Sequence, residues 1–289
     1  MGILHEENDD WLVSEFRAPR NQHQKLDNSI HNDDVAKPLG FRGGTVAGII
    51  HHEQFAPIML ELFGQRWFEH GSLSLYYTWA TTDSEPVRIW VEKPKSGDAQ
   101  QVAVWMEHQN GNKVLEGTAS VGDVDPSKTA LAGKYAERRQ GGENRILADI
   151  PVGEPFTEIR RVTMKEQRSR REVITEDLEW YWGESPWGGP ICTPVTMFRL
   201  LDASQHLADK LPPKVVGLYG AIEVRVNGGP LFVDKDYEVT ARVLAIGDTP
   251  KTEIMWREAT LKELDTGKEI GSLLMQNRWM KGSSDLWND

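Results

Sequence analysis

The stretch "NSIHNDDVAKPLGFRGGTVAG", residues 28–48, places one histidine and two adjacent acids ahead of a glycine-rich turn. The residues that follow, 49–63, have apolar side chains at helical spacing, which predicts a helix that lies on a sheet. The first N–H groups of a helix have no intrahelical acceptor, and glycine lets a ligand approach them closely. Two interpretations of His31 follow: a base beside an anion site, or a surface histidine ahead of an ordinary turn.

A weak internal repeat accompanies this stretch. Residues 39–60, "LGFRGGTVAGIIHHEQFAPIML", are echoed by residues 185–207, "SPWGGPICTPVTMFRLLDASQHL". Each segment has a Gly-Gly turn, a step of small residues and then an apolar segment, and Pro194 suits the first turn of a helix. Runs rich in β-forming residues follow in both halves, with turn signals at Asn110-Gly111 and at Asp265-Thr266-Gly267. These runs predict two hairpins.

A long repeated unit of one helix and several antiparallel strands predicts two similar domains packed together. We assign residues 1–125 to the first domain and residues 151–289 to the second. Residues 126–150 are charged, contain glycine and have weak periodicity, which is typical of a linker. The expected fold class is α+β, with two antiparallel sheets that each wrap around a central helix.

Composition excludes several classes of function. The formal net charge of −11 argues against a general nucleic-acid-binding protein, which must neutralise phosphates. No run approaches the roughly 18 apolar residues of a membrane span, and the acidic start has no apolar signal segment. Cys192 is the single cysteine, so no intramolecular disulfide can form. We expect a cytoplasmic protein with no membrane or nucleic-acid partner.

The opening stretch resembles the pattern of the MaoC-like and (R)-specific enoyl-CoA hydratase family, whose members have the hotdog fold. The second half resembles the start of another hotdog domain, so the likeness covers most of the chain as a double hotdog. The matching positions in the first half are Asn28, Ser29, Ile30, His31, Asp33 or Asp34, Ala36, Gly40, Phe41 and Gly48.

The sequence departs from the family pattern at one catalytic position. The family aspartate lies five positions before the histidine, where this chain has Leu26, which carries no acidic proton. Asp27 is one position late, and a one-residue slip of the loop would bring its carboxylate into the site. The second half has no histidine at the matching place, so the resemblance assigns the chemistry to the first half.

The resemblance implies three catalytic residues for hydration of a 2-enoyl thioester. His31 would be the base, because a histidine pKa lies near neutrality. The backbone N–H of Gly48 would stabilise the enolate oxygen at the helix start. Asp27 would replace the missing aspartate in proton transfer. No cofactor is implied, and a coenzyme A thioester is the implied substrate.

Five further residues are candidates for substrate binding. Arg42 could hold a carboxylate or a phosphate, although a surface arginine would look the same in sequence. Gly43 and Gly44 would let the ligand approach the backbone. His51 and His52 lie in the first turn of the predicted helix, where adjacent side chains point about 100° apart, so at most one faces a pocket. No metal is expected, since "HHE" lacks the spacing that aims two histidines at one ion.

Three functional hypotheses remain open on the sequence. The first is a hydratase or dehydratase that acts on an acyl thioester. The second is a thioesterase, or another lyase or isomerase on the same fold, because fold does not dictate reaction. The third is a ligand-binding protein that lost its catalytic pair. Each implies a small acyl ligand as partner, and pairing of two chains into a homodimer stays open.

Overall fold

The computed structural model describes residues 4–95, 97, 99–139, 141–174 and 176–287. Its strands are β1 (Leu4–Glu6), β2 (Trp11–Ser14), β3 (Gly71–Tyr77), β4 (Val87–Glu92), β5 (Gln100–His108), β6 (Lys113–Val121), β7 (Phe156–Arg160), β8 (Gly217–Val226), β9 (Tyr237–Asp248), β10 (Thr252–Glu263) and β11 (Glu269–Met280). Its α-helices are α1 (Asp33–Ala36), α2 (Ile50–Phe63), α3 (Arg66–His70), α4 (Ala130–Ala136), α5 (Met164–Arg168) and α6 (Pro194–Leu201). Short 3₁₀ helices span Pro126–Lys128, Arg171–Val173, Glu179–Tyr181, Ser204–Lys210, Lys281–Ser283 and Asp285–Trp287.

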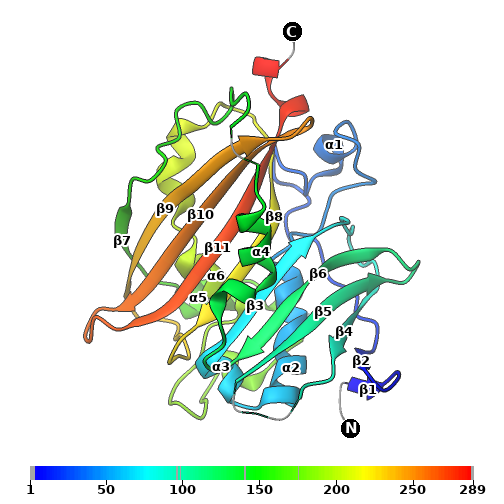
Figure 1. Ribbon diagram of the computed structural model, residues 1–289, viewed down its shortest axis with the longest axis vertical. Coiled ribbons are helices and arrows are strands. Elements are labelled where there is room, and N and C mark those ends of the chain that lie inside the picture. Colours follow the sequence, from blue (N-terminus) through cyan, green and yellow to red (C-terminus); the bar gives the residue numbers. More distant parts are fainter. Residues whose placement is uncertain (1–3, 96, 98, 140, 175, 288–289) are drawn as a thin grey trace.

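The strands form one continuous antiparallel sheet of eleven strands (Figure 1). Their order is β1-β2-β4-β5-β6-β3-β8-β11-β10-β9-β7. The prediction of two sheets therefore needs a correction: β3 and β8 pair with each other, from Ser72 opposite Arg225 to Tyr76 opposite Ala221, and this pairing joins the halves. The seam between β3 and β8 is the centre of the molecule.

Each half follows the same plan of one helix and four strands. In the first half α2 precedes β3, β4, β5 and β6, and in the second half α6 precedes β8, β9, β10 and β11. In both, the first strand pairs with the fourth, the fourth with the third, and the third with the second. The two predicted hairpin turns are present, with Gly111 and Gly267 at φ values of 86° and 67° that favour glycine.

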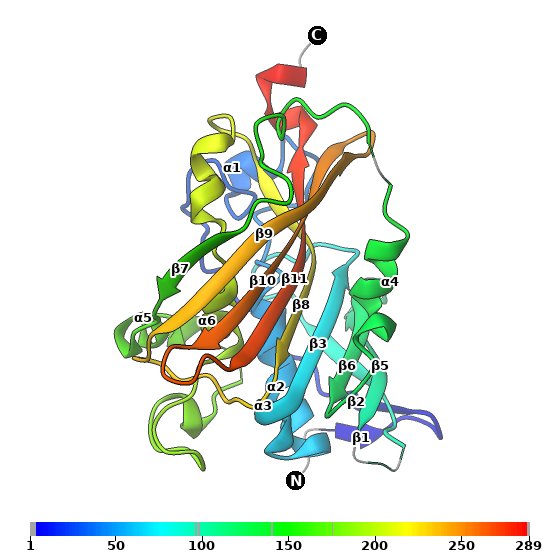
Figure 2. The ribbon, with the colours of Figure 1, turned by 60° about the vertical axis from the view of Figure 1, so that its left-hand side comes forward.

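The central helices lie on the same face of the sheet, as the two views together show (Figures 1 and 2). Helix α2 packs Phe55 and Met59 against Leu73 and Leu75 of β3 in one core cluster. The helix continues through Pro57 without ending. Helix α6 buries its apolar side chains in a second cluster against β8, β9, β10 and β11. Both central helices therefore bury their apolar faces on one shared sheet.

The segment predicted as a linker, residues 126–150, carries helix α4 on the opposite face of the sheet (Figure 2). Leu131 of α4 is fully buried, and its N–H donates to the hydroxyl of Ser74 on β3 at 2.9 Å. Successive side chains of β3 thus point to opposite faces of the sheet, with the leucines toward α2 and the serines toward α4. The segment therefore covers the seam between the halves.

Candidate active site

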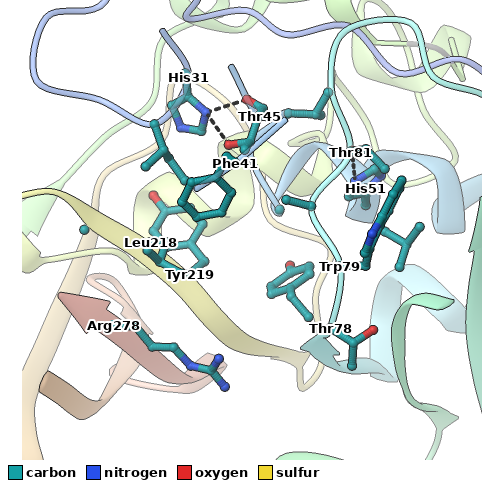
Figure 3. Close-up of a pocket in the computed structure, with 17 residues that line it drawn as sticks. His31, Phe41, Thr45, His51, Thr78, Trp79, Thr81, Leu218, Tyr219 and Arg278 are labelled. Carbon is teal, nitrogen blue, oxygen red and sulfur yellow. Dashed lines mark hydrogen bonds between the residues drawn. The ribbon is translucent and has the colours of Figure 1, made fainter. Parts of the chain in front are cut away.

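A cavity of about 330 Å³ lies where β3 ends and β8 begins (Figure 3). Its walls come from the loop before α2, the first turn of α2, the end of β3 with residues 78–81, the start of β8, and one residue each of β6 and β11. The residues that line it include His31, Gly48, His51, Tyr77, Tyr219 and Arg278. The two halves of the molecule therefore meet at this cavity, and both contribute to it.

His31 lines the cavity and is fixed as one tautomer. Its Nδ1 lies 2.7 Å from the carbonyl oxygen of Thr45. A carbonyl oxygen can only accept, so Nδ1 carries the proton and Nε2 is left with its lone pair. Burial lowers the pKa of His31, and the hydrogen bond to Thr45 opposes this effect. The imidazole is therefore neutral at neutral pH and can act as a base.

The backbone around His31 is held by close contacts. The side-chain amide of Asn21 donates to the carbonyl oxygen of His31 at 2.8 Å, and the N–H of Thr45 donates to Ile30 at the same distance. A Cβ added to Gly44 would lie 2.3 Å from the carbonyl oxygen of His31. Only glycine allows this approach of two backbone segments, so Gly44 sets the position of the histidine.

Gly48 lies in the turn that leads into α2, two residues before the helix begins, and lines the same cavity as His31. Its carbonyl oxygen accepts the N–H of His51, whereas its own N–H has no acceptor among the described residues. A Cβ on Gly48 would lie 2.7 Å from Cζ of Tyr77, so the tyrosine ring packs directly on this glycine. A free N–H at a helix N-terminus is suited to stabilising an oxyanion.

Gly43 and Gly44 lie behind the cavity and do not line it. The N–H of Gly44 donates to Oδ1 of Asp33 at 2.6 Å. A Cβ on Gly43 would lie 3.2 Å from the same oxygen. The Asp33 carboxylate is thus part of the turn, and the amide that we expected to face a ligand has an acceptor within the protein.

Arg42 is engaged within the protein. Its guanidinium forms a bidentate ion pair with Glu85, including a 2.7 Å hydrogen bond from Nη2 to Oε2. It also donates to the carbonyl oxygen of Ala80 at 3.0 Å and lies 4.0 Å from the centroid of the Trp79 ring. The hydrogen bond from Arg42 lowers the pKa of Glu85 to about 2. Arg42 therefore supports the loop after β3 and has no free charge to offer a ligand.

The two adjacent histidines of α2 point in different directions. His51 lines the cavity, with Nδ1 3.1 Å from Oε1 of Gln54 and Nε2 3.1 Å from the hydroxyl of Thr81. His52 lies away from the cavity, and its Nε2 is 3.0 Å from the hydroxyl of Tyr77. Burial lowers the pKa of His51 to about 4 and that of His52 to about 3. Both are neutral, hydrogen-bonded parts of the core.

Asp27 lies outside the cavity. Asp27 and the neighbouring Leu26 are both exposed. The chain turns at Asn28, whose φ is 54°. Among the described residues, no aspartate or glutamate lines the cavity. The expected slip of the loop, which would place this carboxylate beside His31, does not occur.

Sequence reasoning missed Tyr77, Tyr219 and Arg278, which all line the cavity. Burial raises the pKa of Tyr219 to about 12 and that of Tyr77 well above its usual value, so both hydroxyls stay protonated. The alternation in "SLSLYY" could have identified Tyr77 as an inward-facing strand residue. Tyr219 and Arg278 reach the cavity through the pairing of β3 with β8, which leaves no local signal in the sequence.

The N-terminus of α6, the counterpart of the α2 helix start, is filled from within the protein. Oε1 of Glu53, a residue of α2, accepts the N–H of Val195 at 3.0 Å. Glu53 is 2% exposed, and its Oε2 has no partner among the described residues. Burial raises the pKa of Glu53 to about 7, opposed by the Val195 N–H and the nearby charge of Arg170. A carboxyl of the first half thus occupies the helix end of the second half.

The described residues contain neither a cluster of metal-binding side chains nor a helix that could span a membrane. No group of three or more histidine, cysteine, aspartate or glutamate side chains there could hold a metal ion. None of the helices in the described ranges has both the length and the hydrophobicity needed to cross a membrane.

Comparison of the structure with solved structures finds similar proteins. No protein-family model matches the chain, and no curated protein matches it. The structure is similar to that of a conserved hypothetical protein from Mycobacterium tuberculosis described as having a double hotdog fold. The TM-score is 0.56, at 9% identity over 86% of this chain and 86% of that chain. The chain thus has the double hotdog fold.

Among proteins of this fold, the chain is similar to MaoC-like dehydratases. A protein from Chloroflexus aurantiacus J-10-fl, described as a MaoC domain dehydratase, matches with a TM-score of 0.61 at 14% identity, over 96% of this chain and 94% of that chain. A second MaoC-like dehydratase matches with a TM-score of 0.52 at 16% identity, over 94% and 97% of the two chains. The chain has the double hotdog fold of MaoC-like dehydratases, which confirms the fold implied by the resemblance.

Proposed function

We propose that the protein adds water to, or removes it from, a 2-enoyl thioester of the coenzyme A type. One observation carries this proposal: His31, with Nδ1 held by Thr45 and Nε2 available, lines the same cavity as the unpaired N–H of Gly48. A base and an oxyanion donor in one cavity are the two elements that hydration of such a thioester requires.

A single histidine can complete the proton transfers. In hydration, Nε2 of His31 takes a proton from water while the water oxygen forms a bond to C3 of the enoyl group. The electrons of the C2–C3 double bond move to the thioester oxygen, which becomes an enolate that the Gly48 N–H stabilises. The protonated Nε2 then returns its proton to C2, and the carbonyl re-forms. The cavity has no carboxylate in its described lining, so one base serves both steps.

The surroundings of His31 favour this role. Burial lowers its pKa, so the ring is neutral and basic at neutral pH. The carbonyl of Thr45 accepts from Nδ1 and stabilises the imidazolium that forms during the reaction. We therefore expect kcat/KM to be constant above pH 6.5 and to fall at lower pH, with a midpoint below the usual histidine pKa.

The proposal is tested by turnover on a panel of 2-enoyl-CoA and 3-hydroxyacyl-CoA substrates. His31→Ala is expected to lower kcat by about 100- to 10,000-fold, the usual range for loss of a general base. His206→Ala is the matched control, because His206 stacks on Phe156 in the second half, outside the cavity.

Two outcomes would contradict the proposal. One is a folded His31→Ala variant that keeps the rate of the original protein. The other is release of free thiol without any change at the double bond, which would assign a thioesterase instead. Binding of the thioesters without turnover by the original protein would support a ligand-binding role.

A further inference from the structure

Arg278 of β11 lines the cavity, and the proposed reaction does not use it. Its Nε donates to Oε1 of Gln276 at 2.8 Å, and its Nη2 donates to the hydroxyl of Tyr76 at 2.6 Å. Both acceptors are neutral, and the guanidinium forms no ion pair with a carboxylate of the described residues. Two of its nitrogens are thus held in place, while its charge is left uncompensated.

Three other arginines of the sheet and its loops form ion pairs with carboxylates. Arg42 pairs with Glu85, Arg88 pairs with Glu107, and Arg257 pairs with Asp202. A partly buried cation without a counter-ion is unfavourable, because desolvation is not repaid by a partner. A guanidinium that is fixed beside a cavity and lacks a carboxylate is suited to an anionic ligand.

Tyr76, which accepts from Arg278, also has a lysine near its ring. Nζ of Lys134, on helix α4, is 4.6 Å from the centroid of the Tyr76 ring, and Cζ of Arg278 is 5.2 Å from the same centroid. Both cations thus lie near the Tyr76 ring, but Lys134 is exposed and does not line the cavity, so Arg278 is the cation that a ligand there would meet. This pair of cations belongs to a chain with a net charge of −11.

The position of Arg278 relative to the base matters for the ligand. In Figure 3 His31 and Arg278 lie at opposite ends of the cavity, with Leu218 and Tyr219 between them. A ligand whose reacting carbons lie at His31 therefore places a more distant part of its chain at Arg278. The group bound there takes no part in the chemistry but can orient the molecule.

We propose that Arg278 binds an anionic oxygen group of the thioester ligand. This inference rests on the proposed function for its choice of ligand. Two sources supply the same chemistry: a phosphate of the coenzyme A part, or a carboxylate at the far end of the acyl chain. Arg278 is then a specificity-determining residue that favours charged over neutral ligands.

Calorimetric titration with paired probes tests this inference. Coenzyme A against pantetheine measures the contribution of phosphates. Glutaryl against butyryl thioesters of N-acetylcysteamine measures that of a carboxylate, because neither probe carries phosphate. We expect Arg278→Gln to weaken binding of one charged probe by about tenfold or more, as for loss of a charge-assisted hydrogen bond, without weakening its neutral counterpart.

Two variants keep the test interpretable. Arg278→Lys retains the charge and should recover part of the affinity. Arg242→Gln, which breaks an exposed pair with Glu258 on the outer strands, is the control and should bind as the original protein does. Equal loss for charged and neutral probes, or no preference for a charged probe in the original protein, would overturn the inference.

Failure of this inference can be told apart from failure of the proposed function, because binding is measured without turnover. If the protein prefers a charged probe but hydrates no enoyl thioester, the proposed reaction is wrong and the role of Arg278 stands. If the protein hydrates enoyl thioesters but binds charged and neutral probes equally well, the role of Arg278 is wrong and the proposed reaction stands.

Discussion

The two central helices begin in different surroundings. The N-terminus of α2 opens into the cavity, beside His31 and with the Gly48 N–H free of an acceptor among the described residues. The N-terminus of α6 is closed, because Oε1 of Glu53 accepts the N–H of Val195. A helix N-terminus attracts an anionic oxygen in both cases. In one half a ligand can supply that oxygen, and in the other the protein supplies it.

This difference explains how a duplicated architecture can keep one reactive centre. Glu53 follows His51 and His52 in α2, so the helix that forms the open site also closes the second one. The second half instead contributes walls to the open cavity, through Tyr219 of β8 and Arg278 of β11. The halves are thus specialised, and neither could form this cavity alone.

The largest expected effect on stability comes from opening the closed helix end. Glu53→Ala would leave the Val195 N–H without its acceptor, Arg170 without a nearby negative charge, and a void in the core. We expect a loss of about 3 kcal/mol in the free energy of unfolding, measured with urea. Glu61→Ala, an exposed position on the same helix, should change it by no more than about 0.5 kcal/mol. Equal effects would show that Glu53 does not hold the halves together.

The next effect is on the dependence of stability on pH. Burial raises the pKa of Glu53 to about 7 from its usual 4.5, so the folded state binds this proton more tightly than the unfolded state does. Its contribution to stability is therefore complete below pH 4.5 and is lost as the pH rises through 7, by as much as about 3 kcal/mol.

Glu53→Gln removes this proton while keeping an oxygen for Val195. The difference in unfolding free energy between this variant and the original protein should shift in favour of the variant from pH 5 to pH 8. Urea titrations at several pH values measure it. A difference that stays constant over that range would mean that Glu53 does not titrate there.

A smaller effect is expected at the open helix end. Gly48→Ala places a Cβ 2.7 Å from the Tyr77 ring, which must move in a packed core. We expect a loss of about 1–3 kcal/mol in stability, typical of overpacking, together with a fall in turnover. Gly133→Ala on α4 is the control: nothing lies within 4 Å of its new Cβ, so it should be neutral or stabilising by about 0.5–1 kcal/mol. Full activity of folded Gly48→Ala would argue against an oxyanion role.

The smallest effect is expected for Arg42→Gln. The ion pair with Glu85 is partly exposed, so its loss should change the free energy of unfolding by less than about 1 kcal/mol. The KM for coenzyme A thioesters should not change, because Arg42 does not line the cavity. A clear rise in KM would show that Arg42 binds the ligand. It would then be wrong that Arg278, which has no ion pair among the described residues, binds the ligand while the paired Arg42 does not.

Local patterns predicted the fold well. The apolar spacing of residues 49–63 matches α2, which spans Ile50–Phe63, and the glycine turns predicted both hairpins. His31 and Gly48 also line one cavity, and both belong to the single stretch 28–48 that the sequence singled out. Such features depend on neighbours in the chain, which sequence periodicity records.

Residues that depend on distant partners could not be predicted. Arg42 was predicted to bind a ligand, but in the fold it pairs with Glu85, which lies 43 positions away in the loop after β3. Glu53 accepts its hydrogen bond from the N–H of Val195, which lies 142 positions away. Arg278 reaches the cavity only because β3 pairs with β8 and joins the two halves. Neither composition nor periodicity encodes which edges of two sheets will meet.

The count of ligand sites on one chain tests most directly whether only the α2 helix start is open. Calorimetric titration with a saturated coenzyme A thioester, which cannot be hydrated, measures that count. We predict one molecule bound per chain. Two molecules per chain would contradict the closure of the α6 helix end by Glu53, and the absence of binding would contradict the open site itself.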